Sequence, residues 1–188
     1  MTSFKGWWNA EAGTTDAVRF KRRLEARGIS YEAVKEKLFD STKSFHERLR
    51  WRPGIKGEND LLAVLGLGRE EAREIVGDFL ESMGEKERFW DYAGLAGSPE
   101  EKCPLKLVRR ALEVISKTAS IFSVQFLWDW LSLDPKLEKR DPWECRINFP
   151  STMGPHNWSL TLPCSLERML TLKVMDAIKA INRKAGRA

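Results

Sequence analysis

The side chains that most often carry metal or nucleophilic chemistry are few in this chain and far apart. The cysteines Cys103, Cys145 and Cys164 include no CxxC pair, and the two histidines, His46 and His156, are distant in sequence. This pattern supports neither a zinc site nor a disulfide framework. We therefore predict no metal site, and we expect the cysteines to be structural thiols, because a free cysteine usually behaves as a small buried hydrophobe.

The charged residues exclude some classes of function. The net charge is +5, and clustered Lys and Arg would indicate nucleic-acid binding because they neutralise phosphates. Here the bases alternate with acids, as in the run Glu-Glu-Ala-Arg-Glu at 70–74, which is typical of solvated helix faces. No stretch is long and apolar enough for a membrane helix, and the N-terminus lacks the apolar core of a signal peptide. We expect a cytoplasmic protein that binds neither nucleic acid nor membranes.

Most of the chain has the apolar periodicity of helices, and its 188 residues, 42% of them apolar, suffice for about one domain with a buried core. Glycines, prolines and capping residues mark the expected ends. The pattern predicts helices over 14–28, 30–38, a segment that is capped by Asp40 or Ser41 and carries Phe45 and Leu49, 58–67, 69–83, 104–118 and 165–184.

Two later segments break this period. Residues 120–126, Ser-Ile-Phe-Ser-Val-Gln-Phe, are β-branched and aromatic and directly follow a helix, so they predict a buried parallel-type strand. Residues 134–158 are rich in Pro, Asn, Gly and Trp and predict an ordered loop. One strand cannot form a sheet, because its backbone needs neighbours. The chain is therefore either mostly helical with an odd apolar segment, or the end of an α/β barrel whose other strands lie elsewhere.

Three short motifs resemble one known family. Residues 146–152 read Arg-Ile-Asn-Phe-Pro-Ser-Thr and are soon followed by Asn157-Trp158, residues 127–133 read Leu-Trp-Asp-Trp-Leu-Ser-Leu, and residues 6–8 read Gly-Trp-Trp. In this order they resemble motifs of the amylomaltase-type 4-α-glucanotransferases (disproportionating enzymes, glycoside hydrolase family 77). The chain departs from the family pattern at Trp128, Ser151 and Leu160-Thr161, where Gln, Gly and an aromatic-Arg pair are usual.

The resemblance implies a fold that is mostly α with one or two strands, the C-terminal part of a (β/α)8 TIM barrel. Residues 1–118 would be the helical segment between strands seven and eight, and residues 119–188 would hold strand eight, a substrate-side loop and the final helix. The whole enzyme would transfer α-1,4-glucan (maltooligosaccharide) segments to the 4-hydroxyl of an acceptor, with retention and without a cofactor. Its catalytic carboxylates would precede Met1, so we expect this chain to be inactive without the missing N-terminal part of the barrel.

The resemblance also identifies candidate substrate-binding residues. Asn148 and Asn157 can both donate and accept hydrogen bonds, as vicinal sugar hydroxyls require, and Trp158 offers an apolar face to a sugar ring. Asp129 follows the predicted strand, where barrel active sites lie, and one carboxylate cannot serve as both nucleophile and acid/base. Arg146, Asn148 and Asn157 could instead tie the loop together through backbone hydrogen bonds, and Asp129 could be a cap.

Two other classes of function remain open at this point. The chain could be a freestanding carbohydrate-binding or regulatory module that keeps the sugar loop without catalysis. It could also be a basic helical interaction protein. A Thr-His-Asp triplet encoded just upstream of Met1 would favour the transferase.

Overall fold

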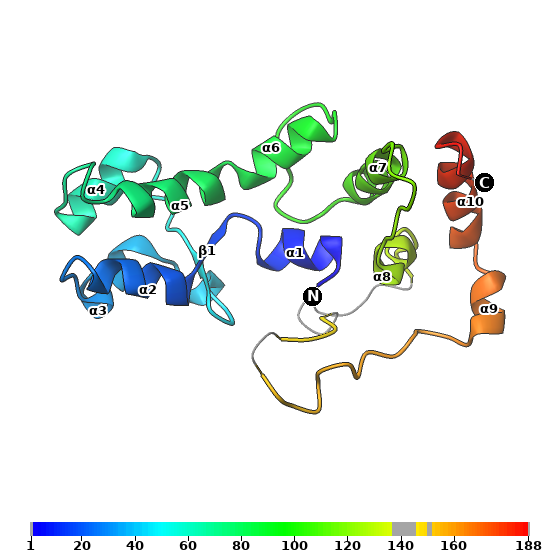
Figure 1. Ribbon diagram of the computed structural model, residues 1–188, viewed down its shortest axis with the longest axis horizontal. Helices are drawn as coiled ribbons and strands as arrows, with labels where there is room; N and C mark the ends of the chain where they lie inside the picture. Colours follow the sequence, from blue (N-terminus) through cyan, green and yellow to red (C-terminus); the bar gives the residue numbers. More distant parts are fainter. Residues whose placement is uncertain (1, 137–145, 150–151, 188) are drawn as a thin grey trace. The chain divides into compact units, whose positions relative to one another are not determined.

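The computed structural model describes residues 2–136, 146–149 and 152–187, and this part of the chain is mostly helical (Figure 1). The helical prediction is confirmed. The elements are α1 (Phe4–Ala10), β1 (Thr14–Asp16), α2 (Ala17–Glu25), α3 (Tyr31–Leu38), the 3-10 turn η1 (Ser41–Lys43), β2 (Arg48–Arg50), α4 (Glu58–Leu65), α5 (Arg73–Met83), α6 (Glu85–Tyr92), α7 (Leu105–Ser116), α8 (Leu127–Leu131), α9 (Leu166–Leu170) and α10 (Val174–Lys184).

The chain divides into two compact units. The inserted unit is Glu11–Arg88, and the terminal unit combines Met1–Ala10 with Phe89–Ala188. The second boundary falls inside α6. These boundaries differ from the division expected at residue 118, and the assignment of 1–118 and 119–188 to parts of a barrel stays a prediction.

A short two-stranded antiparallel sheet lies at the start of the inserted unit. Strand β1 pairs antiparallel with β2, with Thr14 opposite Arg50 and Asp16 opposite Arg48. Asp16 also ends the strand and caps α2, since its Oδ1 accepts a hydrogen bond from the Arg19 N–H at 2.8 Å. The helix predicted from Thr14 therefore begins only at Ala17, because the β-branched Thr14 and Thr15 lie in the strand.

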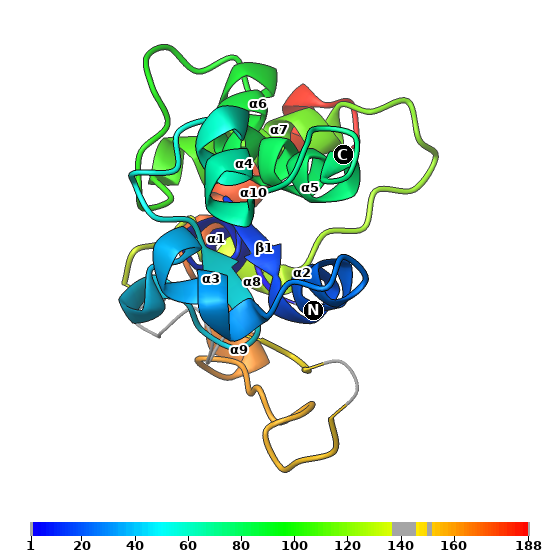
Figure 2. The same cartoon turned by 90° about the vertical axis from the view of Figure 1, so that its left-hand side faces the viewer.

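The core of the inserted unit is aromatic. Phe20, Phe39, Trp51 and Phe79 are all buried, and the Trp51 ring centroid lies 4.6 to 5.6 Å from the other three. Trp51 Nε1 donates to Ser82 Oγ at 2.8 Å, which satisfies the indole's one donor. These contacts bring α2, the C-terminal end of α3, the residue after β2 and α5 around one centre. Figure 2 gives a second view of α2 and α3, which contact each other.

The helix predicted after residue 40 is wrong. Asp40 does cap a turn, since its Oδ1 accepts from the Thr42 N–H at 3.0 Å, but that turn is only the 3-10 element η1. The chain then enters β2, in which Leu49 is buried. Phe45, which was expected to lie in this helix, is 55% exposed. Pairing with β1 satisfies the backbone of this segment more fully than one marginal helix would.

The terminal unit packs α7, α8 and α10 together with α1. Its core includes Trp8, Trp90, Leu107 and Leu131, each at most 1% exposed. Helix α7 matches the prediction closely, with Pro104 as its N-cap. The helix predicted over 165–184 is split into α9 and α10. Thr171 Oγ1 donates to the Arg168 carbonyl at 2.8 Å at the break, a bond that competes with helix continuation.

The segment predicted as a strand, residues 120–126, has no strand partner among the described residues. The segment forms neither helix nor strand, and its apolar side chains are exposed: Ile121 by 88%, Phe122 by 83% and Val124 by 92%. Sequence pattern gives the type of side chain but cannot supply a neighbouring strand. The two strands observed in the described residues are β1 and β2 instead.

Two further expectations concern side chains and membranes. Cys103 is buried and Cys164 partly buried, both as free thiols, while Cys145 lies outside the described residues. Within the residues that the structure describes, no helix is long and apolar enough to cross a membrane.

Candidate functional site

The first residues of α8 form one side of the candidate site, in the terminal unit. Phe126 is the N-cap of α8, and its carbonyl accepts a hydrogen bond from the Asp129 N–H at 2.9 Å. Trp128 and Trp130 are each 7% exposed and belong to the core of this unit. The Leu-Trp-Asp-Trp-Leu motif thus forms a short helix that is anchored by its tryptophans.

The loop that carries the amides folds back on itself. The Trp158 N–H donates to the Ile147 carbonyl at 2.6 Å, and the Phe149 N–H donates to Asn157 Oδ1 at 2.8 Å. Asn157 Nδ2 in turn donates to the Thr152 carbonyl at 2.9 Å. Asn157 therefore ties two arms of the loop together, which is the structural role that sequence left open for it.

Aromatic contacts strengthen the same loop. The Arg146 guanidinium lies over the Phe149 ring, 5.1 Å from its centroid, and the Phe149 ring meets His156 edge to face at 5.1 Å. Such stacking suits the planar guanidinium. Asn148 is half-buried. Its neighbours in sequence are both held by hydrogen bonds of their backbone: the Ile147 carbonyl accepts from Trp158, and the Phe149 N–H donates to Asn157. The position of Asn148 along the loop is therefore fixed from both sides.

Trp158 is the most exposed aromatic residue of the candidate site. Its side chain is 73% exposed, and its φ of 62° lies in the left-handed region, which is unusual for a bulky residue. The indole borders a hollow of about 280 Å³, whose other lining residues are apolar: Phe126, Leu127, Trp128, Ile147, Leu160 and Leu162. A ligand with an apolar face could lie here between the loop and the start of α8.

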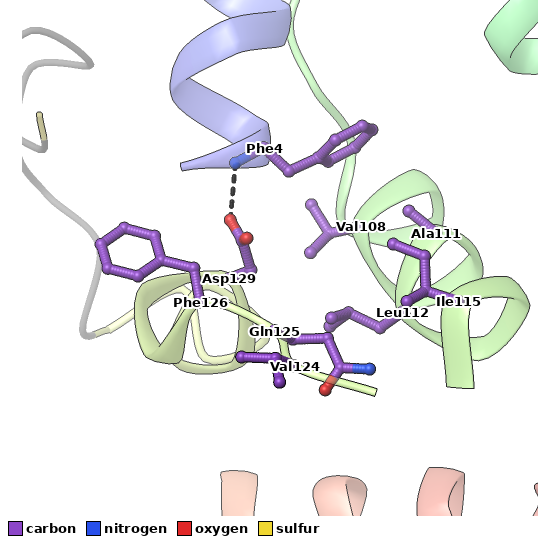
Figure 3. A pocket seen from close by; sticks show the side chains of 9 residues that line it. All are labelled: Phe4, Val108, Ala111, Leu112, Ile115, Val124, Gln125, Phe126 and Asp129. Atoms are coloured by element: carbon purple, nitrogen blue, oxygen red, sulfur yellow. Dashed lines mark hydrogen bonds between the residues drawn. The ribbon is translucent and has the colours of Figure 1, made fainter. Parts of the chain in front are cut away.

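Asp129 belongs to a second hollow and has a structural task. Its Oδ1 accepts a hydrogen bond from the Phe4 N–H at 2.6 Å (Figure 3). Ser3 Oγ accepts a further one from the Gly6 N–H at 3.1 Å. Together they satisfy donors in the first turn of α1, where a carboxylate is favourable. The hollow, about 150 Å³, is otherwise lined mainly by α7 and residues 124–126.

The structure thus brings together some of the predicted site residues. Trp158 and its loop neighbours Asn148 and Asn157 lie at the apolar hollow or next to residues that line it, while Asp129 lines the other hollow; Phe126 borders both. Sequence reasoning missed Leu160 and Leu162 as lining residues. Their i, i+2 spacing after Trp158, which places two side chains on one side of an extended segment, was the available signal.

Known proteins resemble the chain over part of its length. It is 31% identical over 119 residues to a 4-α-glucanotransferase of Chlamydia trachomatis, 25% identical over 119 residues to one of Chlamydia muridarum, and 27% identical over 124 residues to one of Chlamydia caviae. These matches cover 63 to 64% of this chain. The chain is therefore related in sequence to part of these proteins.

The three relatives are longer than this chain. The chain spans 22% of the length of each of the three. No protein-family model matches the chain, and no solved structure does.

Proposed function

We propose that this chain is the C-terminal part of a 4-α-glucanotransferase, in which it contributes to binding of the glucan. The whole enzyme would transfer an α-1,4-glucan segment to the 4-hydroxyl of an acceptor glucan. Two observations support this proposal: the three ordered motifs, and the sequence relationship to three proteins that carry this name.

The exposed Trp158 beside the apolar hollow is the observation that carries the binding role. A pyranose ring has an apolar face that packs on an indole and a rim of hydroxyls that need both donors and acceptors. Trp158 offers the first and is 73% exposed. Asn148, on the same loop, offers an amide with both donor and acceptor groups. Asn157 holds the loop in shape through its bonds to Phe149 and Thr152.

Catalysis in this proposal depends on residues outside the chain. Retaining transfer needs two carboxyl groups about 5 Å apart, one as nucleophile and the other as acid and then base. Among the described residues that line the two hollows, Asp129 is the one carboxylate, and it accepts the Phe4 N–H. We therefore infer that the carboxylates of the reaction are supplied by the N-terminal part of a complete barrel.

The exposed segment 120–126 supports the same proposal. Ile121, Phe122 and Val124 present β-branched and aromatic side chains to solvent at 83 to 92% exposure. In a complete (β/α)8 barrel, strand eight would be hydrogen-bonded on both edges, and such side chains would be covered. We propose that residues 119–188 supply this strand, the substrate-side loop and the last helix, and that residues 1–118 connect strands seven and eight.

Binding of maltoheptaose to the purified chain tests the proposed site. We expect Trp158→Gly to weaken binding measured by calorimetry, because the indole is lost. Glycine adopts a φ of 62° without the steric cost that a side chain carries, so the fold should be retained. Tyr92→Ala, which removes an aromatic ring that is 71% exposed and does not line the hollow, is the matched control. Equal binding by Trp158→Gly and the unaltered chain would contradict the sugar-binding role.

An activity test separates the transferase from a binding module. The chain alone should release no glucose from maltotriose and form no longer glucans. In a chimera, this chain would replace the matching segment of the Chlamydia trachomatis 4-α-glucanotransferase. Transfer by the chimera, lost with Trp158→Gly, would support the transferase. Glucan binding by the chain, combined with a folded but inactive chimera, would favour a freestanding carbohydrate-binding module.

A further inference from the structure

The inserted unit contains a hollow of its own, which the proposed transfer site does not use. It measures about 360 Å³ and lies among α2, α3, η1 and β2. Phe39 and Leu49, which are 3% and 8% exposed, and the half-buried Tyr31 give it apolar walls. Lys21, Lys35 and Ser41 are among the polar residues that line it. The hollow therefore combines an aromatic ring with several hydrogen-bonding groups.

The charged side chains that line this hollow, Lys21, Lys35, Glu32 and Glu36, sum to zero. Lys35 forms an ion pair with Glu32, and Arg52 Nη2 lies 3.9 Å from Glu36 Oε2. The Lys21 ammonium lies over the Tyr31 ring, 4.7 Å from its centroid. Lys35, Glu32 and Glu36 each have a partner of opposite charge, so an ionic ligand would have to compete with these pairs. A neutral ligand with many hydroxyls meets no such barrier.

Tyr31 can serve as the stacking surface. Burial raises the pKa of its hydroxyl above 10.0, and the charge of nearby Lys35 acts in the opposite direction, so the phenol stays neutral and able to donate at physiological pH. Lys21 has a long flexible stem, and a single cation–π contact with the half-buried Tyr31 ring is weak. A sugar ring that lay on Tyr31 could displace the ammonium, which could then donate to the sugar hydroxyls.

We propose that this hollow is a second glucan-binding site, which takes one stretch of a neutral α-1,4-glucan on Tyr31. The choice of glucan rests on the proposed function, whereas the hollow and its balanced charges are independent of it.

Titration of the full chain with maltoheptaose, followed by amide chemical shifts, tests this site directly. We expect shifts in residues 31–49 of the inserted unit, separate from shifts in residues 146–162. Tyr31→Ala should weaken binding at the first set about fivefold or more, and Tyr31→Phe should weaken it less, since the ring is retained. Because Tyr31 also packs against the core, the exposed Ser41→Leu gives a second test: it narrows the hollow while the core remains.

The outcomes distinguish this site from the proposed transfer site. Loss of the shifts at 31–49 in Tyr31→Ala and Ser41→Leu, with those at 146–162 retained, would support the second site. Trp158→Gly should leave the shifts at 31–49 unchanged. Shifts confined to 146–162 would overturn the second site while the proposed function stands. Shifts confined to 31–49 would instead contradict the binding role of Trp158.

Discussion

The Phe4 N–H donates a hydrogen bond to Asp129 Oδ1 at 2.6 Å across 125 positions of sequence. The two residues belong to α1 and α8, which carry the first two motifs of the family resemblance, Gly-Trp-Trp at 6–8 and Leu-Trp-Asp-Trp-Leu at 127–131. The bond therefore places next to each other two segments that the sequence related only by their order. In the terminal unit, the Asp129 carboxylate therefore reaches from α8 to the N-terminal end of α1.

Asp129→Ala should destabilise the terminal unit. The change removes the acceptor of the Phe4 N–H and a negative charge at a helix N-terminus, and loss of a capping side chain costs about 1 kcal/mol. Asp129→Asn keeps an acceptor and should cost less. Urea unfolding measures both variants. Maltoheptaose binding at Trp158 should remain unchanged, and a loss of binding at constant stability would show that Asp129 contacts the sugar instead.

Local signals predicted the helix ends well. Gly84 lies at the end of α5, and Pro104 is the N-cap of α7. The three short helices α1, α6 and α8 were not predicted. They are rich in aromatic residues, which have low intrinsic helix propensity. Trp8, Trp90 and Trp130, one from each, are instead buried in the core, so tertiary packing decides their conformation.

The apolar segment 120–126 should promote association of the chain. Ile121, Phe122 and Val124 form a run of exposed apolar side chains, and such runs pair with other chains. Phe122→Ser should reduce light scattering at high protein concentration without lowering the free energy of unfolding. Leu170→Ser, at a position that is 75% exposed outside this run, is the control and should change little. Equal scattering of both variants would contradict the role of this segment.

Asp78 should make the stability of the inserted unit depend on pH. The carboxyl is 6% exposed, and burial raises its pKa above the ordinary 3.8, although Arg19 and Arg23 lower it. The effect of burial on the pKa of Asp78 exceeds that of the two ion pairs for two reasons. Arg19 is half-exposed, and Arg23 Nη1 lies 2.8 Å from Oδ2 without the alignment of a hydrogen bond. The folded state therefore holds the Asp78 proton more tightly than the unfolded state.

The sign of the pH effect follows from this raised pKa. The contribution of Asp78 is fully present below about 3.8 and is lost as the pH rises through its higher folded pKa. Other groups act in the opposite direction, since the pKa of Glu74 is lowered by its bond to Arg27. The difference in unfolding free energy between the unaltered chain and Asp78→Asn isolates the effect. This difference should fall as the pH rises from about 4, and a constant difference would exclude it.

The sequence pointed to the loop that carries Trp158, but it did not predict that Leu160 and Leu162 line the hollow, and it left the roles of the amides open. Amide side chains near an exposed tryptophan can bind a ligand or tie a loop, and one sequence does not say which. The bonds of Asn157 to Phe149 and Thr152 give it the second role. The hollow beside Trp158 depends on Phe126 and Leu127, which are distant in sequence. Contacts of this kind depend on the fold and carry no local signal.

Asn157 and Asn148 should respond differently to substitution, and the contrast tests how the loop works. Asn157→Ala leaves the Phe149 N–H and the Thr152 carbonyl without their partner, so the loop should open. Hydrogen exchange at the Phe149 and Trp158 amides should then become faster. Asn157→Asp retains an acceptor for Phe149 and should protect that amide better than alanine does.

Asn148→Ala should instead weaken glucan binding while the loop stays closed. The backbone on either side of Asn148 is held by the bonds of Ile147 and Phe149, neither of which uses its side chain. A hydrogen bond to a sugar hydroxyl contributes roughly 0.5 to 1.5 kcal/mol, up to about tenfold in affinity. Calorimetry with maltoheptaose and exchange at the Trp158 amide separate the two effects. Faster exchange with unchanged affinity would mean that Asn148, like Asn157, serves the loop, and Trp158 would then be the main contact for the sugar.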